Sequence, residues 1–401
     1  MSTVALGCFA VFAGCGEPSE HGTDQAAAGD GAPHDAADGQ GDVTGDAVTV
    51  PVDGLAVIEL GEVSTGGDGY GPWVPLQLPA GVTTITLVLR STDDVTLQLA
   101  GWDQPGAVDI APKAWLQTAG TAGVCLAPCA NRILAQPGVA AFLAPNTPLV
   151  ELRSGAHAIR PYAFRSENGN EIGMATKVRI TAYLGWSTPA RRRLALNVAL
   201  TGAGGLDRTT APKSSELQQA LATASALLGV AGIELGPIRY RDVDPTLRFV
   251  TSRSGPKSDL AQLLASGADF EPGLNLFLVD QIWLGGGGIP GLDLMLGIAG
   301  GIPGDPFGHD HRRAGVAIAW GLGTDQEGLL GTVIAHELGH YLGLFHTTEA
   351  PGSDGALLPD NLPDTAAPAP QNLMHWSVTT TCKDLSHEQR QVLRRSAALR
   401  L

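Results

Sequence analysis

The chain has 401 residues, of which 44% are hydrophobic and 16% charged, with 53 Gly and 27 Pro. This length leaves room for two or three domains, each able to bury a core. The apolar content argues against disorder over the whole chain. The many Gly and Pro disfavour long helical bundles and coiled coils.

The formal net charge of −15 is unevenly distributed along the chain. Residues 1–89 hold 12 of the 40 acidic side chains and no Lys or Arg, which leaves 28 acidic against 25 basic side chains in the remainder. We expect no nucleic-acid partner, because this nearly neutral remainder has no basic footprint. No uninterrupted apolar run reaches the 18 or so residues of a membrane-spanning helix, so we expect no such helix.

The first 15 residues form a short apolar segment that ends in small residues before Cys15. Phe12–Cys15 resembles the lipobox of bacterial lipoprotein signals, except for the Phe; such signals are cleaved before a Cys that receives the lipid. The resemblance implies an exported chain that touches the membrane only through a lipid on Cys15. A lipid-anchored chain would lie at the outer membrane or cell surface. An exported chain without the anchor would be periplasmic or extracellular. The alternative is an ordinary buried N-terminal strand or an uncleaved N-terminal tail.

Residues 16–47 are mostly Gly, Ala and Asp, which predicts a disordered acidic linker. Residues 48–188 consist of short alternating apolar runs between turn residues, a pattern that predicts an antiparallel β-sandwich. The expected strands include 55–63, 83–90, 94–102, 157–165 and 177–186. Four aromatic side chains in this region either line a binding face or belong to the core: Trp73, Trp102, Trp115 and Tyr162.

From residue 189 onward, strand and helix patterns alternate. We predict strands at 194–200, 238–243, 274–280 and 315–320, and helices at 215–230 and 259–264. Ser215 and Gln218 have the spacing of a capping box. The Gly-rich stretch 285–308 lacks the Lys and the following helix of a phosphate-binding loop, so we interpret it as a mobile loop.

A further helix carries the residues with the clearest chemistry. Thr324–Glu327 has the pattern of a capping box that would begin this helix. His336 and His340 are four residues apart, so they share one helical face and can offer two imidazoles to a tetrahedral Zn²⁺. Glu337 projects beside the metal, where a carboxylate can take a proton from a zinc-bound water.

The helix is expected to end at Gly343, because Gly accepts the left-handed conformation common at helix ends. The chain can then turn back and bring His346 in as a third ligand. The string His336–His346, HELGHYLGLFH, fixes five positions of an extended zinc motif. At this composition we put its chance occurrence in the chain at about 3 in 100,000.

This string resembles the extended zinc-binding signature of the metzincin metallopeptidases. Asn372–Met374 is similar to the family's Met-turn, and His346–Glu349 with Asp364–Thr365 is most similar to the pappalysin-like branch. The resemblance covers about residues 194–401. It implies a two-lobed metzincin α/β zinc-protease domain with a Met-turn at 189–401. With the antiparallel β-sandwich predicted from the alternating pattern, this gives an α+β chain. The family sheet has an antiparallel edge strand, for which Gly315–Trp320 is the candidate.

The sequence departs from the family at one position near the Met-turn. Several metzincins have a Tyr two residues after the Met, where Trp376 stands here, and an indole cannot ligate zinc. His375 either substitutes for that Tyr or is structural. His309 and His311 either hold a second metal or belong to a loop. Three acidic residues after the motif either bind Ca²⁺, as in some relatives, or are ordinary loop acids: Asp354, Asp360 and Asp364.

These observations predict an exported zinc endopeptidase that hydrolyses a protein or peptide substrate. One Zn²⁺ on His336, His340 and His346 would polarise the scissile carbonyl, with Glu337 as general base. One alternative is a surface adhesion or glycan-binding lipoprotein with a vestigial zinc domain. Another is a zinc hydrolase that acts on a non-peptide amide.

Overall fold

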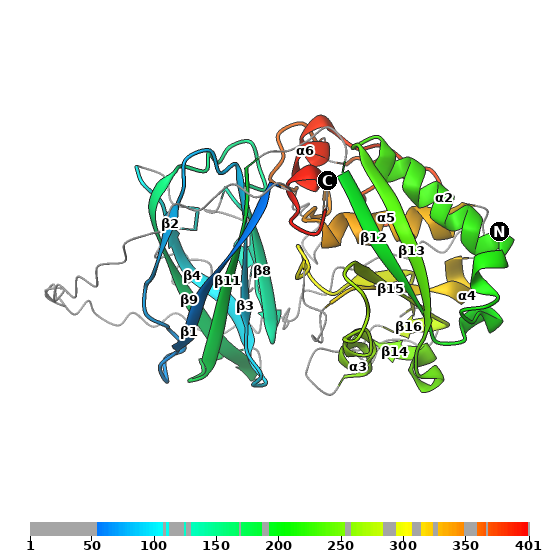
Figure 1. Ribbon diagram of the computed structural model, residues 1–401, viewed down its shortest axis with the longest axis horizontal. Coiled ribbons are helices and arrows are strands. Elements are labelled where there is room, and N and C mark those ends of the chain that lie inside the picture. Colours follow the sequence, from blue (N-terminus) through cyan, green and yellow to red (C-terminus); the bar gives the residue numbers. More distant parts are fainter. Residues whose placement is uncertain are drawn as a thin grey trace, which may run out of the picture.

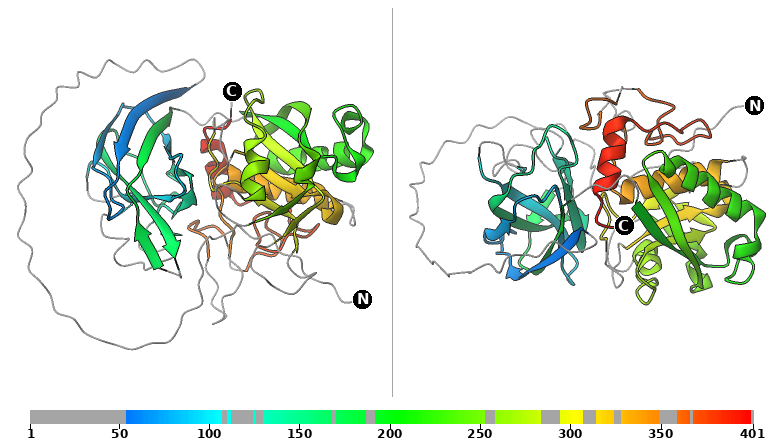
Figure 2. Two further views of the ribbon diagram at one scale, coloured as in Figure 1. Left: turned by 90° about the horizontal axis from the view of Figure 1, so that it is seen from below. Right: turned by 45° about the horizontal axis from the view of Figure 1, so that its top comes forward.

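The structure is a computed structural model, and it describes residues 54–106, 110–111, 124–125, 130–167, 170–186, 192–252, 258–283, 294–306, 314–323, 328–348, 359–365 and 368–399. These residues mix helices and strands in two regions that lie side by side (Figure 1). We call residues 54–186 the N-terminal sandwich and residues 192–399 the C-terminal region. Helix α6 (His387–Arg395) lies between the two regions (Figure 2).

The N-terminal sandwich consists of two antiparallel sheets. One has the order β1 (Leu55–Ser64), β11 (Lys177–Gly185), β3 (Thr84–Arg90) and β8 (Val139–Ala144). The other has the order β10 (Asn170–Gly173), β9 (Gly155–Glu167), β4 (Thr96–Asp103) and β7 (Gln136–Pro137), with β2 (Val74–Leu78) also paired to β9. A short ribbon joins β5 (Val124–Cys125) to β6 (Ile133–Leu134).

The alternation of side chains explains this packing, since successive residues of a strand point to opposite faces. Inward side chains of both sheets, such as Leu87, Leu97 and Ile180, form one apolar core. The strands expected from the sequence are present, each within a few residues of its predicted bounds. Trp102 and Tyr162 are buried, as core aromatic residues would be. Trp73 is 36% exposed, and Trp115 lies outside the described residues.

The C-terminal region is built on a sheet with the order β13 (Ile233–Asp242), β12 (Arg192–Leu200), β15 (Leu274–Val279), β19 (Val316–Ala319) and β18 (Gly297–Ala299). The first four strands are parallel, and only β18 runs antiparallel to its neighbour. The prediction that Gly315–Trp320 is the antiparallel edge strand is therefore wrong. β19 lies inside the sheet, and β18 is the antiparallel edge.

The interpretation of 285–308 as a mobile loop is wrong for its described part, since residues 294–306 contain two short strands. β17 (Leu294–Met295) pairs with β16 (Gln281–Trp283) in a small sheet with β14 (Phe249–Thr251), and β18 follows. Gly residues hide this pattern because they contribute no apolar side chain to the alternation. Residues 284–293 and 307–308 lie outside the described part.

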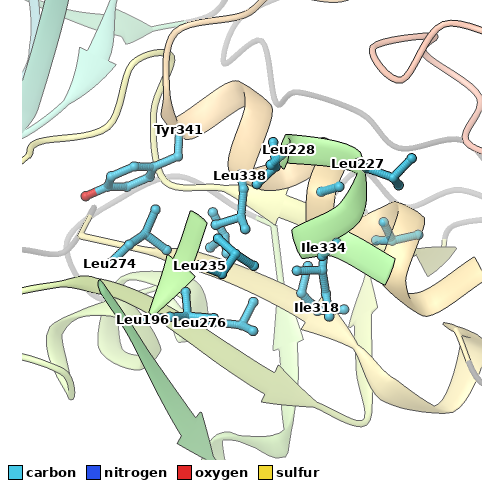
Figure 3. Close-up of a cluster of buried hydrophobic side chains, with 14 of the residues drawn as sticks. Leu196, Leu227, Leu228, Leu235, Leu274, Leu276, Ile318, Ile334, Leu338 and Tyr341 are labelled. Carbon is cyan, nitrogen blue, oxygen red and sulfur yellow. The ribbon is translucent and has the colours of Figure 1, made fainter. Parts of the chain in front are cut away.

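Helices cover both faces of the five-stranded sheet. α2 (Ser215–Gly229) and α5 (Leu329–Tyr341) pack on one face, while α3 (Asp259–Ala265) packs on the other. Figure 3 shows the core beneath α5, where Ile334 and Leu338 point toward Leu276 and Ile318 of the sheet. The remaining helical elements are α4 (Trp320–Gly323), η1 (Ala203–Gly205), η2 (Ala211–Lys213) and η3 (Pro245–Arg248).

Two helix starts differ from the predictions. The cap of α2 is Ser214, whose hydroxyl accepts from the N–H of Leu217, whereas Gln218 donates to Ala211 and Tyr240. α5 begins at Leu329 after Gly328, with no side-chain cap; the predicted box at 324–327 lies outside the described residues. No helix in the described part of the chain combines the length and apolarity that crossing a membrane requires.

Candidate metal centre

Helix α5 is buried along all 13 of its residues, including the polar Thr332, His336, Glu337 and His340. Its tight contact with α2 depends on Gly331: a Cβ there would lie 2.6 Å from Cβ of Thr223 and 2.7 Å from the carbonyl oxygen of Ala220. The sheet, α2 and the C-terminal segment thus enclose α5. Such a helix holds its polar side chains in fixed positions.

The helix ends as the sequence predicts. Gly343 has φ +113°, and the N–H of Leu344 donates to the carbonyl of Gly339 at 3.0 Å. This conformation strongly favours Gly. The chain turns back at Gly343, so that His346 returns toward the face of α5 that carries His336 and His340.

The three histidines meet in the interior, each at most 1% exposed. Nε2 of His340 lies 3.1 Å from Nε2 of His346, and one ligand nitrogen from each histidine lies within 4.8 Å of the others. The ring centroids of His336 and His346 are 5.3 Å apart. The structure thus brings together His336, His340 and His346 as a group able to hold a metal ion.

Backbone carbonyls orient two of these rings. Nδ1 of His336 lies 2.6 Å from the carbonyl oxygen of Leu373, and Nδ1 of His340 lies 2.7 Å from that of Leu344. A carbonyl can only accept, so each Nδ1 carries the proton and each Nε2 keeps its lone pair. Nε2 of His336 is buried without a hydrogen-bond partner. An orphaned lone pair of this kind is suited to a cation.

Burial also keeps these ligands neutral. Desolvation and, second, the neighbouring His346 together lower the pKa of His336 to about 3, against the opposing hydrogen bond with Leu373. Desolvation, then His346 and His336, lower the pKa of His340 well below its ordinary value. Since metal ligation needs unprotonated imidazole, both rings are ready to bind at neutral pH without losing a proton.

The donor set fits Zn²⁺. Nitrogen ligands at about 2.0–2.1 Å from a tetrahedral ion are separated by about 3.4 Å, close to the 3.1 Å between Nε2 of His340 and His346. Three imidazoles with a fourth position left open form a set found in catalytic zinc sites. The carbonyls on Nδ1 are the outer partners that fix ligand orientation in such sites.

The side chain of Glu337 on α5 faces the edge strand β18, and the residue is 2% exposed. Its carboxylate rests on the backbone of Gly297 in β18: a Cβ at that residue would lie 2.8 Å from Oε1. No motif or periodicity in the sequence singles out Gly297, because its role depends on pairing between distant segments. The closeness holds Glu337 at the edge of the sheet beside the histidines.

A tight turn at Asn372–His375 packs under α5. The N–H of His375 donates to the carbonyl of Asn372 at 3.0 Å. A Cβ at Gly339 would lie 2.6 Å from Sδ of Met374, so the Gly leaves the space that the Met fills. The same turn presents the Leu373 carbonyl to His336. The segment singled out in the sequence therefore lies directly beneath the histidine group.

The other predicted candidates contribute less. Nδ1 of His375 contacts the backbone of Ser377, at 3.0 Å from its carbonyl, and the His375 charge also lowers the pKa of His336. The Trp376 ring centroid is 5.8 Å from that of His375. His309 and His311 lie outside the described residues. Among the described residues, His336, His340 and His346 are the group of three potential metal ligands whose ligand atoms lie close together.

The acidic residues after the motif have structural partners. Asp364 accepts from the Ser386 hydroxyl at 2.6 Å and the Glu388 N–H at 2.9 Å, which secures the start of α6. Burial raises the pKa of Asp360 to about 6, although hydrogen bonds from Thr365 and Leu362 oppose this rise. Asp354 lies outside the described residues.

Comparisons with known proteins do not establish a family for this chain. No protein-family model matches the chain, and no curated protein matches it. Among solved structures, the chain is similar to metalloproteinase-II from Bacteroides fragilis, with 12% identity over 54% of this chain and 62% of that chain and a TM-score of 0.29. The match spans less than two thirds of that protein. A score this low does not establish a common fold, so we base the functional proposal on the site residues.

Proposed function

We propose that this protein is a zinc-dependent endopeptidase. The observation that carries the proposal is the convergence of three buried imidazoles, with Nδ1 of His336 and His340 each held by a carbonyl, beside Glu337 on the same helix. A purely structural zinc site is closed by four protein ligands, whereas a catalytic site keeps one position open. In the described part of the chain the group has three ligand residues next to a carboxylate, which favours the catalytic kind.

In the proposed mechanism, the histidines hold the metal and Glu337 transfers the proton. When bound, Zn²⁺ supplies the Lewis acid that polarises the scissile carbonyl and acidifies the attacking water. Glu337 accepts one proton of that water while the water oxygen forms a bond to the carbonyl carbon. Glu337 then delivers this proton to the amine nitrogen as the carbon–nitrogen bond breaks. The carbonyls of Leu373 and Leu344 keep two imidazoles in the ligating tautomer throughout.

The edge strand supports a peptide as the substrate. Within the described strands, β18 pairs only with β19, and Glu337 contacts it at Gly297. An extended chain can add to an open sheet edge through backbone hydrogen bonds, which suits recognition of many peptide sequences. A peptide bound there would run past the Glu337 carboxylate.

The proposal extends to the branch of the family. We assign the Asn372–His375 turn as a Met-turn, on the support of the Met374 contact with Gly339 of α5. The pappalysin-like assignment rests on the sequence around His346 and Asp364–Thr365. The domain boundaries at residues 48–188 and 189–401 belong to the same proposal.

The rival functions are weaker on the described residues. A glycan-binding face needs several exposed aromatic rings, but among the described candidates Trp102 and Tyr162 are buried and Trp73 alone is exposed, at 36%. A vestigial domain has no need of the carboxylate of Glu337 beside three ordered ligand residues. A hydrolase of non-peptide amides would use the same groups, so the choice of substrate in the experiment must separate the two.

The test uses the full chain, freed of metal and then reloaded with Zn²⁺. It is incubated with a mixed-sequence peptide library and, separately, with small non-peptide amides. We expect internal peptide cleavage that a chelator abolishes and Zn²⁺ restores. Cleavage of the small amides alone would replace the peptidase proposal, and no zinc-dependent hydrolysis of either would contradict it.

The proposed location rests on the sequence alone. We propose that Cys15 carries a lipid and that residues 16–47 tether the folded part to a membrane surface. Intact-mass analysis of the protein from a bacterial host that processes lipoproteins should show a chain beginning at Cys15 with added lipid. A chain without lipid that keeps residues 1–14 would contradict this.

A further inference from the structure

The N-terminal sandwich reaches the turn that carries the third histidine, which we call the third-ligand turn (residues 342–348). Leu143 of β8 is fully buried in the core cluster of the C-terminal region rather than in that of the sandwich. A Cβ at Gly343 would lie 2.9 Å from Cδ2 of Leu143. The sandwich therefore packs on the residue at which the chain leaves the zinc helix.

Arg132 makes a second contact with this turn. It is 4% exposed, and the centre of its guanidinium lies 5.3 Å from the ring centroid of Phe345, the residue before His346. Its Nη2 also donates to the carbonyl of Pro359. Pro359 in turn forms a β-bridge with Thr348. Arg132 thus binds both sides of the segment that presents His346.

The part of the sandwich that carries Arg132 is itself well ordered by buried amides. Asn146 accepts from the Arg132 N–H at 3.1 Å and donates to the Arg132 carbonyl at 2.7 Å. The N–H of Asn146 donates to Asn131 at 2.8 Å. The segment facing them is fastened too, because Asn361 donates to Asn146 at 2.8 Å. This network fixes the backbone of Arg132 and so the position from which its side chain reaches the third-ligand turn.

His346 differs from the other two ligands in what fixes its position. His336 and His340 stand on a buried helix, whereas His346 stands on a turn, and turns and loops are more mobile than the elements they connect. A three-ligand site needs all three nitrogens held within a few tenths of an ångström of the ligating geometry. Within the C-terminal region, the turn is held by the Leu344 carbonyl on Nδ1 of His340 and by the Thr347 N–H, which donates to the Met374 carbonyl at 3.0 Å. The contacts from the sandwich add to that restraint from the other side.

We propose that Arg132 is a positioning residue for His346, and that the N-terminal sandwich is thereby a working part of the metal centre. This inference rests on metal binding by the three histidines, which is part of the proposed function, but not on peptide hydrolysis. Arg132 acts through Phe345 and Pro359 and is not itself a ligand. Its loss should loosen the third ligand while the helix keeps the other two in place.

The test compares Arg132→Met with Arg160→Met in the full-length protein. Arg160 is a matched control in the same sandwich, since its guanidinium centre lies 4.6 Å from the ring centroid of Tyr70 and its Nε donates to the Gly71 carbonyl at 3.0 Å. Two readouts are taken without substrate: Zn²⁺ affinity by competition with a coloured chelator, and the visible spectrum of the Co²⁺-loaded protein. The melting temperature of the metal-free protein reports general stability.

We expect Arg132→Met to bind Zn²⁺ at least about 10-fold more weakly than the parent, as when outer partners of a metal site are lost. Its Co²⁺ spectrum should change, because the ligand set or its geometry differs. Arg160→Met should keep the affinity and spectrum of the parent. Unchanged metal binding in Arg132→Met would overturn the proposal. So would an equal loss in both variants, because that would indicate general loosening of the sandwich.

Arg132→Lys keeps the experiment decisive if Arg132→Met does not fold. Lys retains a donor for the Pro359 carbonyl but lacks the planar guanidinium over Phe345. We expect an affinity below that of the parent, and a parental affinity and spectrum would overturn the proposal. Failure of the peptidase proposal would look different, since the parent would then bind Zn²⁺ with three histidines and cleave no peptide.

Discussion

The Glu337 carboxylate and the backbone of Gly297 are in such close contact that a Cβ at Gly297 would lie 2.6 Å from Cγ of Glu337. The first residue belongs to helix α5 and the second to the edge strand β18. Their contact joins the proposed general base to the strand that we propose binds the substrate. Its consequence is that a single methyl group at residue 297 should displace the base.

Gly297→Ala should therefore lower peptide hydrolysis without removing the metal. Overpacking of this kind costs about 1–3 kcal/mol, and a displaced base loses much of the roughly 10²- to 10⁴-fold that general-base catalysis contributes. We expect at least about a 10-fold fall in kcat/KM. Gly229→Ala is the control, since a Cβ there meets nothing within 4 Å. Full activity in Gly297→Ala, with the carboxylate unmoved, would show that the contact does not restrain Glu337.

His340→Ala should abolish tight Zn²⁺ binding. The variant keeps two of the three ligand residues, and it also loses the hydrogen bond between His340 and the Leu344 carbonyl, which orders the third-ligand turn. Metal analysis after dialysis should find far less than one Zn²⁺ per chain. His387→Ala, at an exposed position of α6, should retain the metal like the parent. Near-stoichiometric Zn²⁺ in the His340 variant would rule out the proposed ligand set.

Asp360 should make the metal-free protein less stable as the pH rises from about 4 to 6. Its pKa is raised from the model-peptide value to about 6, so in this range the folded chain holds a proton that the unfolded chain has released. The free energy of unfolding then falls with rising pH, by an amount on the order of 3 kcal/mol. The loss is complete above pH 6.

Asp360→Asn removes this proton and keeps an oxygen to accept from Thr365 and Leu362. Buried His336 titrates in the opposite sense, so the informative quantity is the difference in unfolding free energy between variant and parent, measured with urea at several pH values. We expect the variant to gain stability relative to the parent as the pH rises toward 6 and to keep that gain above it. Parallel curves for the two proteins would contradict the raised pKa.

The local parts of the site could be predicted from the sequence. The spacing of His336 and His340, and the Gly at 343, are properties of one helix and its end, where short-range geometry decides the outcome. The Met374 turn could also be singled out, by resemblance. Each of these depends on residues close in sequence to one another.

The features that the sequence does not predict depend on contacts between segments far apart in the chain. Nothing within Gly315–Trp320 tells whether its neighbours run parallel or antiparallel, so the sequence does not show that the edge strand is β18 rather than β19. The contact between Gly297 and Glu337 exists only after β18 has paired with β19. Arg132 and Leu143 lie about 200 residues from the turn they contact, and no periodicity within β8 distinguishes Leu143 from a core residue of the sandwich.

Glu337→Gln tests the proposed chemistry most directly, with Zn²⁺ content and peptide hydrolysis measured on the same preparation. Gln has nearly the same shape as Glu and fills the same space against Gly297, but it cannot accept the proton from the attacking water. The variant should hold as much Zn²⁺ as the parent and lose at least about 100-fold in hydrolysis. Hydrolysis at the parental rate by a fully zinc-loaded Glu337→Gln variant would contradict the role of Glu337 as the general base.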